Sequence, residues 1–192
     1  MNNSKSRHSL IKHLQPDLVL GGTVLALTPQ ILVDHHLKGL ILDVDDTIVP
    51  FKRSFASGEL VEWIDDIRQT VDIWLVSNNL HQSRISTIAD SLNLPYIHGA
   101  GKPSRRKLRK ALEAMNLPKT EVAMVGDRLF TDIVAGNRLG LFTIWVEPIA
   151  PNRAYYPSLR NLEAWLSKGL GVSLPDRPHH LNHNHSDSRN KI

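Results

Sequence analysis

The sequence predicts an α/β fold in which a parallel sheet is covered by helices on both faces. Short apolar runs alternate with segments whose apolar residues recur at helical spacing, and these runs lie at 40–42, 72–76, 96–97, 121–125 and 141–146. Runs of this kind are typical of strands buried on both faces, and their alternation with helices is typical of a parallel sheet. We therefore expect a three-layer domain whose ligand site lies where the carboxyl ends of the strands meet.

The helices are predicted from apolar spacing and from capping residues, and they lie at 29–36, 59–68, 81–92, 104–115, 130–139 and 159–166. In the helix at 59–68 the inward face is formed by Leu60, Trp63, Ile64 and Ile67, and Ser57 or Gly58 can cap its amino end. Pro103 suits the first turn of the helix at 104–115. Prolines and a glycine pair allow only short elements within 13–38.

The length and composition of the chain favour one sizeable core. With 192 residues, of which 41% are hydrophobic, a second full domain is not expected. We expect a single domain at 13–174, between a flexible arm at 1–12 and a disordered tail at 175–192 that is rich in His, Asn and Ser. The tail histidines are interpreted as incidental rather than as metal ligands.

Composition also excludes several classes of site. The chain has no cysteine, so disulfides, thiolate metal sites and a cysteine nucleophile are excluded. The apolar stretch at 18–27 is far shorter than the roughly 20 residues of a spanning helix, so we expect a cytoplasmic protein. The net charge of +4 is uneven, because the segment 102–110 holds only basic charges.

Three aspartates, Asp43, Asp45 and Asp46, follow the apolar run at 40–42 without an intervening turn residue. Carboxylates at the end of a buried strand are unfavourable unless a cation lies beside them. Side chains alternate along an extended chain, so Asp43 and Asp45 are expected to share a face, and their oxygens suit Mg²⁺. The alternative interpretation is a solvated acidic turn.

Polar residues also follow the second and third long apolar runs. Ser77 and Asn78 come after 72–76, and Asp127 comes after 121–125 with Asp132 five residues later. Because parallel strands bring their carboxyl ends to one edge, these side chains are expected to converge on Asp43. Taken singly each has another explanation: a strand-end cap, a turn residue, or for Asp132 a pair with the arginine four residues earlier.

These residues resemble the four motifs of haloacid-dehalogenase (HAD) phosphatases. The motifs are Asp43-Val44-Asp45-Asp46-Thr47, Ser77 after a strand, Lys102 in Gly-Lys-Pro, and Gly126-Asp127 with Asp132. The resemblance spans roughly residues 36–147. It is closest to the YqeG branch, in HAD subfamily IIIA, which includes the mitochondrial phosphatidylglycerophosphate phosphatases. One departure is Asp46, where many relatives carry Gly or Asn.

The resemblance implies a Rossmann-like, HAD-like sheet and a role for each motif residue. Asp43 would attack phosphorus and form an aspartyl phosphate, Asp45 would act as the acid and base, and Lys102 would neutralise charge. The implied phosphate-binding residues are Thr47, Ser77, Asn78 and Lys102. The implied cofactor is Mg²⁺, held by Asp43, Asp127 and the backbone carbonyl of Asp45, with Asp132 orienting the site from behind.

Spacing between the motifs bears on the substrate. The intervals from Asp45 to Ser77 and from Ser77 to Lys102 each hold only one helix and one strand, so no cap domain is expected. An open site favours a large or surface-bound phosphate ester. The resemblance implies phosphatidylglycerophosphate as substrate, with the product phosphatidylglycerol.

Partners and alternatives follow from the same features. The basic helix at 102–110 is a candidate for peripheral contact with an anionic membrane, although its charges could equally form a solvated face. One alternative function is a phosphatase of nucleotides or small phosphorylated metabolites. A nucleic-acid or ribosome-associated protein on the same scaffold is disfavoured, because the basic segment lacks interleaved aromatic residues.

Overall fold

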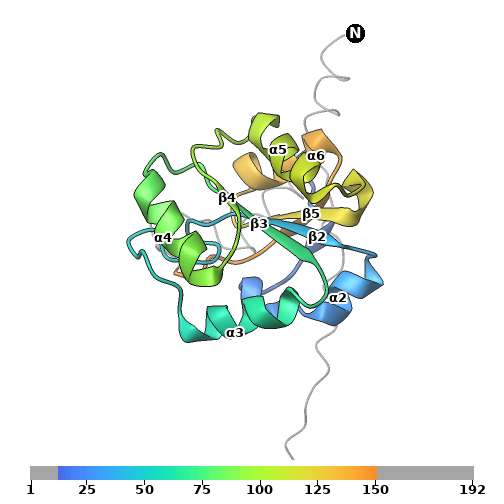
Figure 1. Ribbon diagram of the computed structural model, residues 1–192. Helices are drawn as coiled ribbons and strands as arrows, with labels where there is room; N and C mark the ends of the chain where they lie inside the picture. Colours follow the sequence, from blue (N-terminus) through green and yellow to red (C-terminus); the bar gives the residue numbers. More distant parts are fainter. Residues whose placement is uncertain (1–12, 151–192) are drawn as a thin grey trace, which may run out of the picture.

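The computed structural model describes residues 13–150, which form a single parallel sheet. All of its strand pairs are parallel, and the spatial order is β1-β6-β5-β2-β3-β4 (Figure 1). The strands are Leu18–Val19 (β1), Gly39–Leu42 (β2), Asp72–Val76 (β3), Tyr96–Ile97 (β4), Val122–Gly126 (β5) and Phe142–Trp145 (β6). The predicted α/β class is thereby confirmed.

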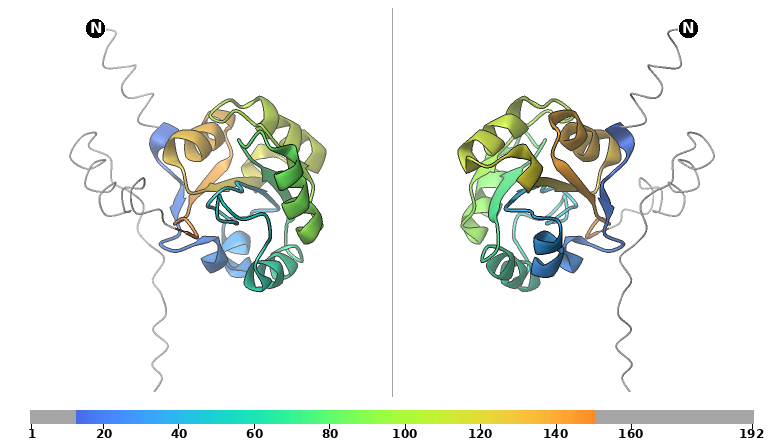
Figure 2. Two further views of the ribbon diagram at one scale, coloured as in Figure 1. Left: turned by 90° about the vertical axis from the view of Figure 1, so that its left-hand side faces the viewer. Right: turned by 90° about the vertical axis from the view of Figure 1, so that its right-hand side faces the viewer.

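Helices cover both faces of the sheet (Figures 1 and 2). The α-helices are Pro29–Asp34 (α2), Gly58–Ile67 (α3), Gln82–Leu92 (α4), Arg106–Met115 (α5) and Val134–Leu139 (α6). Shorter helical turns lie at Val24–Ala26 (η1), Lys119–Glu121 (η2) and Leu129–Ile133 (η3), the last with π-helical hydrogen bonding. None of the helices within residues 13–150 is both long enough and apolar enough to cross a bilayer.

Alternation along the central strands divides the core into two layers. In β2, Leu40 and Leu42 pack with α3 and α4, whereas Ile41 points to the opposite layer with α5. All three side chains are fully buried. This explains why the strand is a continuous apolar run rather than an alternating one, since each face needs its own apolar side chains.

Local details differ from the sequence prediction in three places. β1 was not predicted, because two residues give no readable pattern; Asp17 supports it by accepting hydrogen bonds from the backbone and hydroxyl of Thr143, both at 2.8 Å. The helix expected at 104 begins at Arg106, so Pro103 precedes it. The helix expected at 130–139 opens with the π-helical turn η3. The expected arm, tail and helix at 159–166 lie outside the described residues.

The topology places the site. The chain runs from β2 outward to β3 and β4, then returns to the other side of β2 to form β5. The chain thus leaves β2 in two opposite directions, and the carboxyl ends of the strands at such a switch point are the usual ligand position in α/β sheets. Between Asp43 and Asp127, a stretch described throughout, the chain forms only the sheet and its covering helices. The expected absence of a cap domain is therefore confirmed for this stretch.

Candidate active site

The loop after β2 carries the first motif and turns back on itself. Asp43 still pairs with β5 through its amide, which donates to the carbonyl of Val125 at 2.9 Å. The next residues leave the strand, and Asp46 adopts the left-handed conformation with φ of 64°. Gly, Asn and Asp tolerate this conformation best. The conformation explains the variation noted at position 46, because Gly, Asn or Asp can all make this turn.

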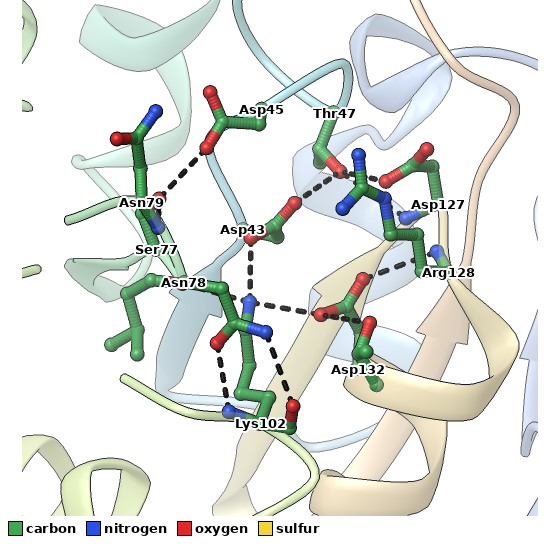
Figure 3. A network of polar contacts seen from close by, with 12 residues as sticks. Asp43, Asp45, Thr47, Ser77, Asn78, Asn79, Lys102, Asp127, Arg128 and Asp132 are labelled. Carbon is green, nitrogen blue, oxygen red and sulfur yellow. Dashed lines mark hydrogen bonds and ion pairs between the residues drawn. The ribbon is translucent and has the colours of Figure 1, made fainter. Parts of the chain in front are cut away.

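Asp43 lies buried at the centre of the site (Figure 3). Its carboxylate accepts hydrogen bonds from the Nζ of Lys102 at 2.5 Å and from the hydroxyl of Thr47 at 3.2 Å. Burial raises the pKa of Asp43 to about 7, although Lys102 opposes the rise; Asp132 and Asp127 raise the pKa further. Without a further cation, Asp43 is therefore held close to its protonation midpoint at neutral pH.

The ammonium group of Lys102 is buried and fully bonded. It donates to Asp43, to Asp132 at 2.8 Å and to the carbonyl of Val76 at 2.8 Å, which uses all three of its protons. Burial alone would lower the pKa of Lys102, but the carboxylates of Asp132 and Asp43 outweigh burial and raise the pKa. Lys102 is thus a permanent positive charge inside the site and not one more cation of a solvated helix.

Asn78 fixes the backbone that carries Lys102. Its side-chain oxygen accepts from the Lys102 amide at 2.7 Å, and its side-chain nitrogen donates to the Lys102 carbonyl at 3.1 Å. The sequence prediction gave Asn78 a phosphate contact. In this arrangement its polar atoms hold the Lys102 segment in place.

Asp127 and Thr47 connect the ends of β5 and β2. The hydroxyl of Thr47 lies 2.9 Å from the carboxylate of Asp127 and accepts a hydrogen bond from the Asp127 amide. The indole nitrogen of Trp145 donates to the Asp127 carbonyl at 2.9 Å. Asp127 is therefore fixed by its backbone on both sides, and its carboxylate faces Asp43 (Figure 3).

Asp132 reaches the site from the π-helical turn η3. One of its oxygens binds Lys102, and the other accepts from the Arg128 amide at 3.1 Å. The turn packs tightly over Gly126: a Cβ at this position would lie 2.4 Å from an Asp132 oxygen. Only glycine at 126 leaves room for the Asp132 carboxylate, which accounts for the Gly-Asp pair of the motif.

Asp43, Asp127 and Asp132 form a buried acidic cluster that fits a hard divalent cation. Each offers an oxygen within 4.8 Å of those of the other two. Two of these carboxylates, Asp43 and Asp132, bind the Lys102 ammonium, and all three residues are buried. Carboxylate oxygens are the ligands that Mg²⁺ prefers. Asp43 and Asp127 directly follow the ends of the adjacent strands β2 and β5, which makes them the candidates for direct ligands.

Asp45 turns away from this cluster. Its carboxylate accepts from the hydroxyl of Ser77 at 2.9 Å and from the guanidinium of Arg84 at 2.5 Å. The expectation that Asp43 and Asp45 share a face assumed a strand that continues through both, whereas β2 ends at Leu42. Ser77, expected at the phosphate, contacts Asp45 instead in this arrangement.

Arg84 was missed by the sequence analysis. It lies in the first turns of α4, which was interpreted only through its apolar face. Two features of the sequence could have indicated Arg84. It follows Ser77 by seven residues, and it lies on the polar face of the helix, opposite the apolar face. Because α4 starts at the carboxyl edge of the sheet, a residue in its first turn lies close to the site.

The sequence comparison decides the family. Residues 99–148 match the family model described as HAD-hydrolase-like. Over 133 residues the chain is 33% identical to the Bacillus subtilis (strain 168) protein named "Probable phosphatase YqeG", and the match covers 69% of this chain and 77% of that protein. The chain belongs to the YqeG-type HAD-like phosphatases. It is thus an enzyme of the phosphatase class.

One further sequence match and two solved structures show weaker similarity to this HAD-like phosphatase. The chain is 30% identical over 140 residues to the acid sugar phosphatase of Staphylococcus aureus (strain USA300), covering 67% of the chain and about half, 53%, of that protein. Among solved structures, a haloacid-dehalogenase-like hydrolase from Brucella suis 1330 has 12% identity and a TM-score of 0.48, covering 68% of this chain and 96% of its own. The HAD-hydrolase YfnB from Bacillus subtilis, described as bound to magnesium, has 15% identity and a TM-score of 0.45, covering 68% and 99%.

Proposed function

We propose that this HAD-like phosphatase hydrolyses phosphomonoesters through an aspartyl phosphate on Asp43, with Mg²⁺ as cofactor. The observation that carries the proposal is a buried carboxylate, Asp43, bonded to a buried ammonium, Lys102, beside further carboxylates. An anionic nucleophile can approach an anionic phosphoryl group only where such charges are balanced. The contacts of Asp43 support its role as that nucleophile.

In the first step an oxygen of Asp43 bonds to phosphorus, the bond from phosphorus to the leaving oxygen breaks, and Asp45 gives that oxygen a proton. In the second step a water oxygen bonds to phosphorus, the bond to Asp43 breaks, and Asp45 takes the proton of the water. Lys102 balances charge on Asp43 and the phosphoryl group throughout. Thr47 and Ser77 are proposed hydrogen-bond donors to the phosphoryl oxygens.

Mg²⁺, when bound, supplies charge neutralisation between Asp43 and the phosphoryl group. We propose Asp43, Asp127 and the backbone carbonyl of Asp45 as its ligands, supported by the buried acidic cluster. Asp132, bonded to Lys102 and to the Arg128 amide, is proposed to orient the cluster from behind.

Mg²⁺ is expected to stabilise the protein more above pH 7 than below it. The pKa of Asp43 is raised to about 7, so below that pH a proton increasingly occupies the carboxyl that must bind the metal. Each pH unit below the pKa should weaken Mg²⁺ binding roughly tenfold. Thermal unfolding with and without Mg²⁺ at about pH 8 and about pH 5.5 checks this result. Asp43→Asn should abolish the pH dependence, and an equal Mg²⁺ effect at both pH values would contradict it.

Phosphatidylglycerophosphate is the substrate that we propose first. The proposal is supported by the resemblance to the YqeG branch and by the absence of a cap domain between Asp43 and Asp127, which leaves the site open to a large ester. The 30% identity to an acid sugar phosphatase supports the second candidate, a small phosphorylated metabolite.

Phosphate release with Mg²⁺ from phosphatidylglycerophosphate in micelles, from sugar phosphates and from nucleotides tests both candidates. Asp43→Asn is the blank. Turnover of the lipid well above that of the soluble esters supports the first candidate. A preparation that hydrolyses soluble esters but not the lipid removes the first candidate and leaves the second.

If the substrate is a lipid, the mouth of the site must face a bilayer, and the loop after the first motif suits that contact. In residues 51–55, two exposed phenylalanines, Phe51 and Phe55, flank the exposed cations Lys52 and Arg53. Exposed aromatic and basic side chains in one loop favour the interface of an anionic bilayer. The basic helix α5 is the alternative contact expected from the sequence, and its Arg106, Arg109 and Lys110 are also exposed.

Replacing both Phe51 and Phe55 by Ser is expected to lower binding to phosphatidylglycerol vesicles by at least about tenfold, because two aromatic rings are lost from the bilayer contact. Co-sedimentation with vesicles measures the effect. Val33→Ser removes another exposed apolar side chain, from α2, and should not change binding. Loss of binding in Arg106→Glu and Arg109→Glu instead would place the contact on α5.

A further inference from the structure

The guanidinium of Arg84 joins the acid of the site to the loop that borders it. One of its NH₂ groups contacts Asp45, Nε donates to the carbonyl of Arg53 at 3.0 Å, and the other NH₂ group donates to the carbonyl of Pro50 at 3.2 Å. The group also lies 5.8 Å from the centre of the Phe51 ring. Its side chain is only 13% exposed. Arg84 is therefore held in a fixed position at the edge of the site.

Both oxygens of the Asp45 carboxylate already have hydrogen-bond partners, whereas the proposed role of Asp45 requires contact with the leaving oxygen. One oxygen accepts from Arg84 and the other from Ser77. Both oxygens of Asp45 are therefore engaged, and a leaving oxygen can contact Asp45 only where one of these partners gives way. Arg84 is the partner that a group on the substrate could bind instead.

The substrate itself can make that exchange. Asp45 must reach the leaving oxygen, so the group attached to that oxygen passes beside Asp45 and hence beside Arg84. A guanidinium binds carboxylates and phosphates through paired, charge-assisted hydrogen bonds. An anion on the leaving group would offer Arg84 such a partner in place of Asp45, whereas an uncharged leaving group would not.

We propose that Arg84 is an anion subsite for the leaving group, which binds a phosphodiester or carboxylate of the substrate and thereby releases Asp45 for proton transfer. This inference rests on the proposed function. It defines the substrate class as phosphomonoesters whose alcohol carries a second negative charge. Phosphatidylglycerophosphate meets this requirement through its phosphodiester, and its acyl chains take no part in the contact with Arg84.

Soluble esters test the subsite apart from any lipid effect. Glycerol 3-phosphate has an uncharged leaving group, 3-phosphoglycerate has a carboxylate, and the deacylated head group glycerophosphoglycerol phosphate has a phosphodiester. The wild type is expected to have higher kcat/KM for the two charged esters. Arg84→Gln should lower their kcat/KM relative to glycerol 3-phosphate by about 10- to 100-fold. Arg84→Lys keeps the charge but loses the paired geometry, so its kcat/KM for the charged esters should lie between those of the wild type and Arg84→Gln.

Arg68→Gln is the matched control. Arg68 also donates to a backbone carbonyl, that of Leu92 at the end of α4, but its ion pair is with Asp65 on α3 and not with an aspartate of the site. Its replacement should leave the ratio between charged and uncharged esters unchanged. If Arg84→Gln lowers kcat/KM equally for all three esters, or leaves the ratio unchanged, Arg84 only supports the loop and the subsite is rejected.

A binding measurement separates this inference from the proposed function. Calorimetry of the three esters with Asp43→Asn, and with the same variant carrying Arg84→Gln, requires no turnover. If Asp43→Asn binds the charged esters more tightly and this preference disappears with Arg84→Gln, the subsite is supported. That conclusion holds even if the wild type releases no phosphate, because absence of phosphate release would reject only the proposed reaction. Equal binding of charged and uncharged esters by Asp43→Asn overturns the subsite.

Discussion

Asp43→Asn is expected to lower phosphate release by at least about four orders of magnitude, since a carboxamide oxygen cannot serve as the nucleophile. The fold should persist, because Asn keeps the size of the side chain. Lys102 also retains its bonds to Asp132 and the Val76 carbonyl. Because burial raises the pKa of Asp43, removing its charge should not lower the free energy of unfolding of the metal-free protein above pH 7.

Initial rates of phosphate release measure this effect, and urea unfolding shows that the variant is folded. Asp90→Asn, which changes an exposed carboxylate on α4, is the matched control and should retain wild-type activity. Should Asp43→Asn keep more than about one hundredth of the wild-type rate, Asp43 is not the nucleophile. In that case a different group must attack phosphorus.

The gathering of the motif residues could be predicted because it depends only on topology. Asp43 and Asp127 each follow a buried apolar run directly, and parallel strands bring such positions to one edge. Lys102 follows the short strand β4 by five residues, so the chain had little freedom to place it elsewhere. The apolar runs and the expectation of a parallel sheet were therefore enough to bring these residues together.

The contacts of Asp45, Asn78 and Arg84 could not be predicted in the same way. They depend on a turn that leaves the strand at Leu42, with Asp46 in the left-handed conformation, and this turn aims Asp45 toward Ser77. Which polar residue on α4 then meets Asp45 depends on how that helix packs on β3. Sequence periodicity fixes the buried face of a helix but not the partners of its polar residues.

Lys102→Met is expected to lower the free energy of unfolding by about 3–5 kcal/mol at neutral pH, because it leaves buried carboxylates without their counter-charge. Asp43 and Asp132 both bind the ammonium of Lys102, whose side chain is 1% exposed, so water has little access to replace it. Activity should fall with stability, since Lys102 bonds both Asp43 and Asp132.

The loss of stability in Lys102→Met should depend on pH in a defined direction. The pKa of Lys102 is raised in the folded state, so its stabilising contribution is present throughout the range below the usual lysine pKa. The pKa of Asp43 is also raised, and near pH 5.5 a proton can neutralise this carboxyl when the ammonium is missing. The loss should therefore be larger at about pH 8 than at about pH 5.5.

Urea unfolding at the two pH values, combined with a double-mutant cycle, tests this account. Adding Asp43→Asn to Lys102→Met should recover part of the stability, because one of the two stranded carboxylates is then uncharged. Lys107→Met is the control: Lys107 donates to the His98 carbonyl from α5 but touches neither aspartate, so its removal should cost little at either pH. Equal losses at both pH values, with no recovery in the double variant, would mean that Lys102 stabilises the site by packing and not by balancing the charge of Asp43.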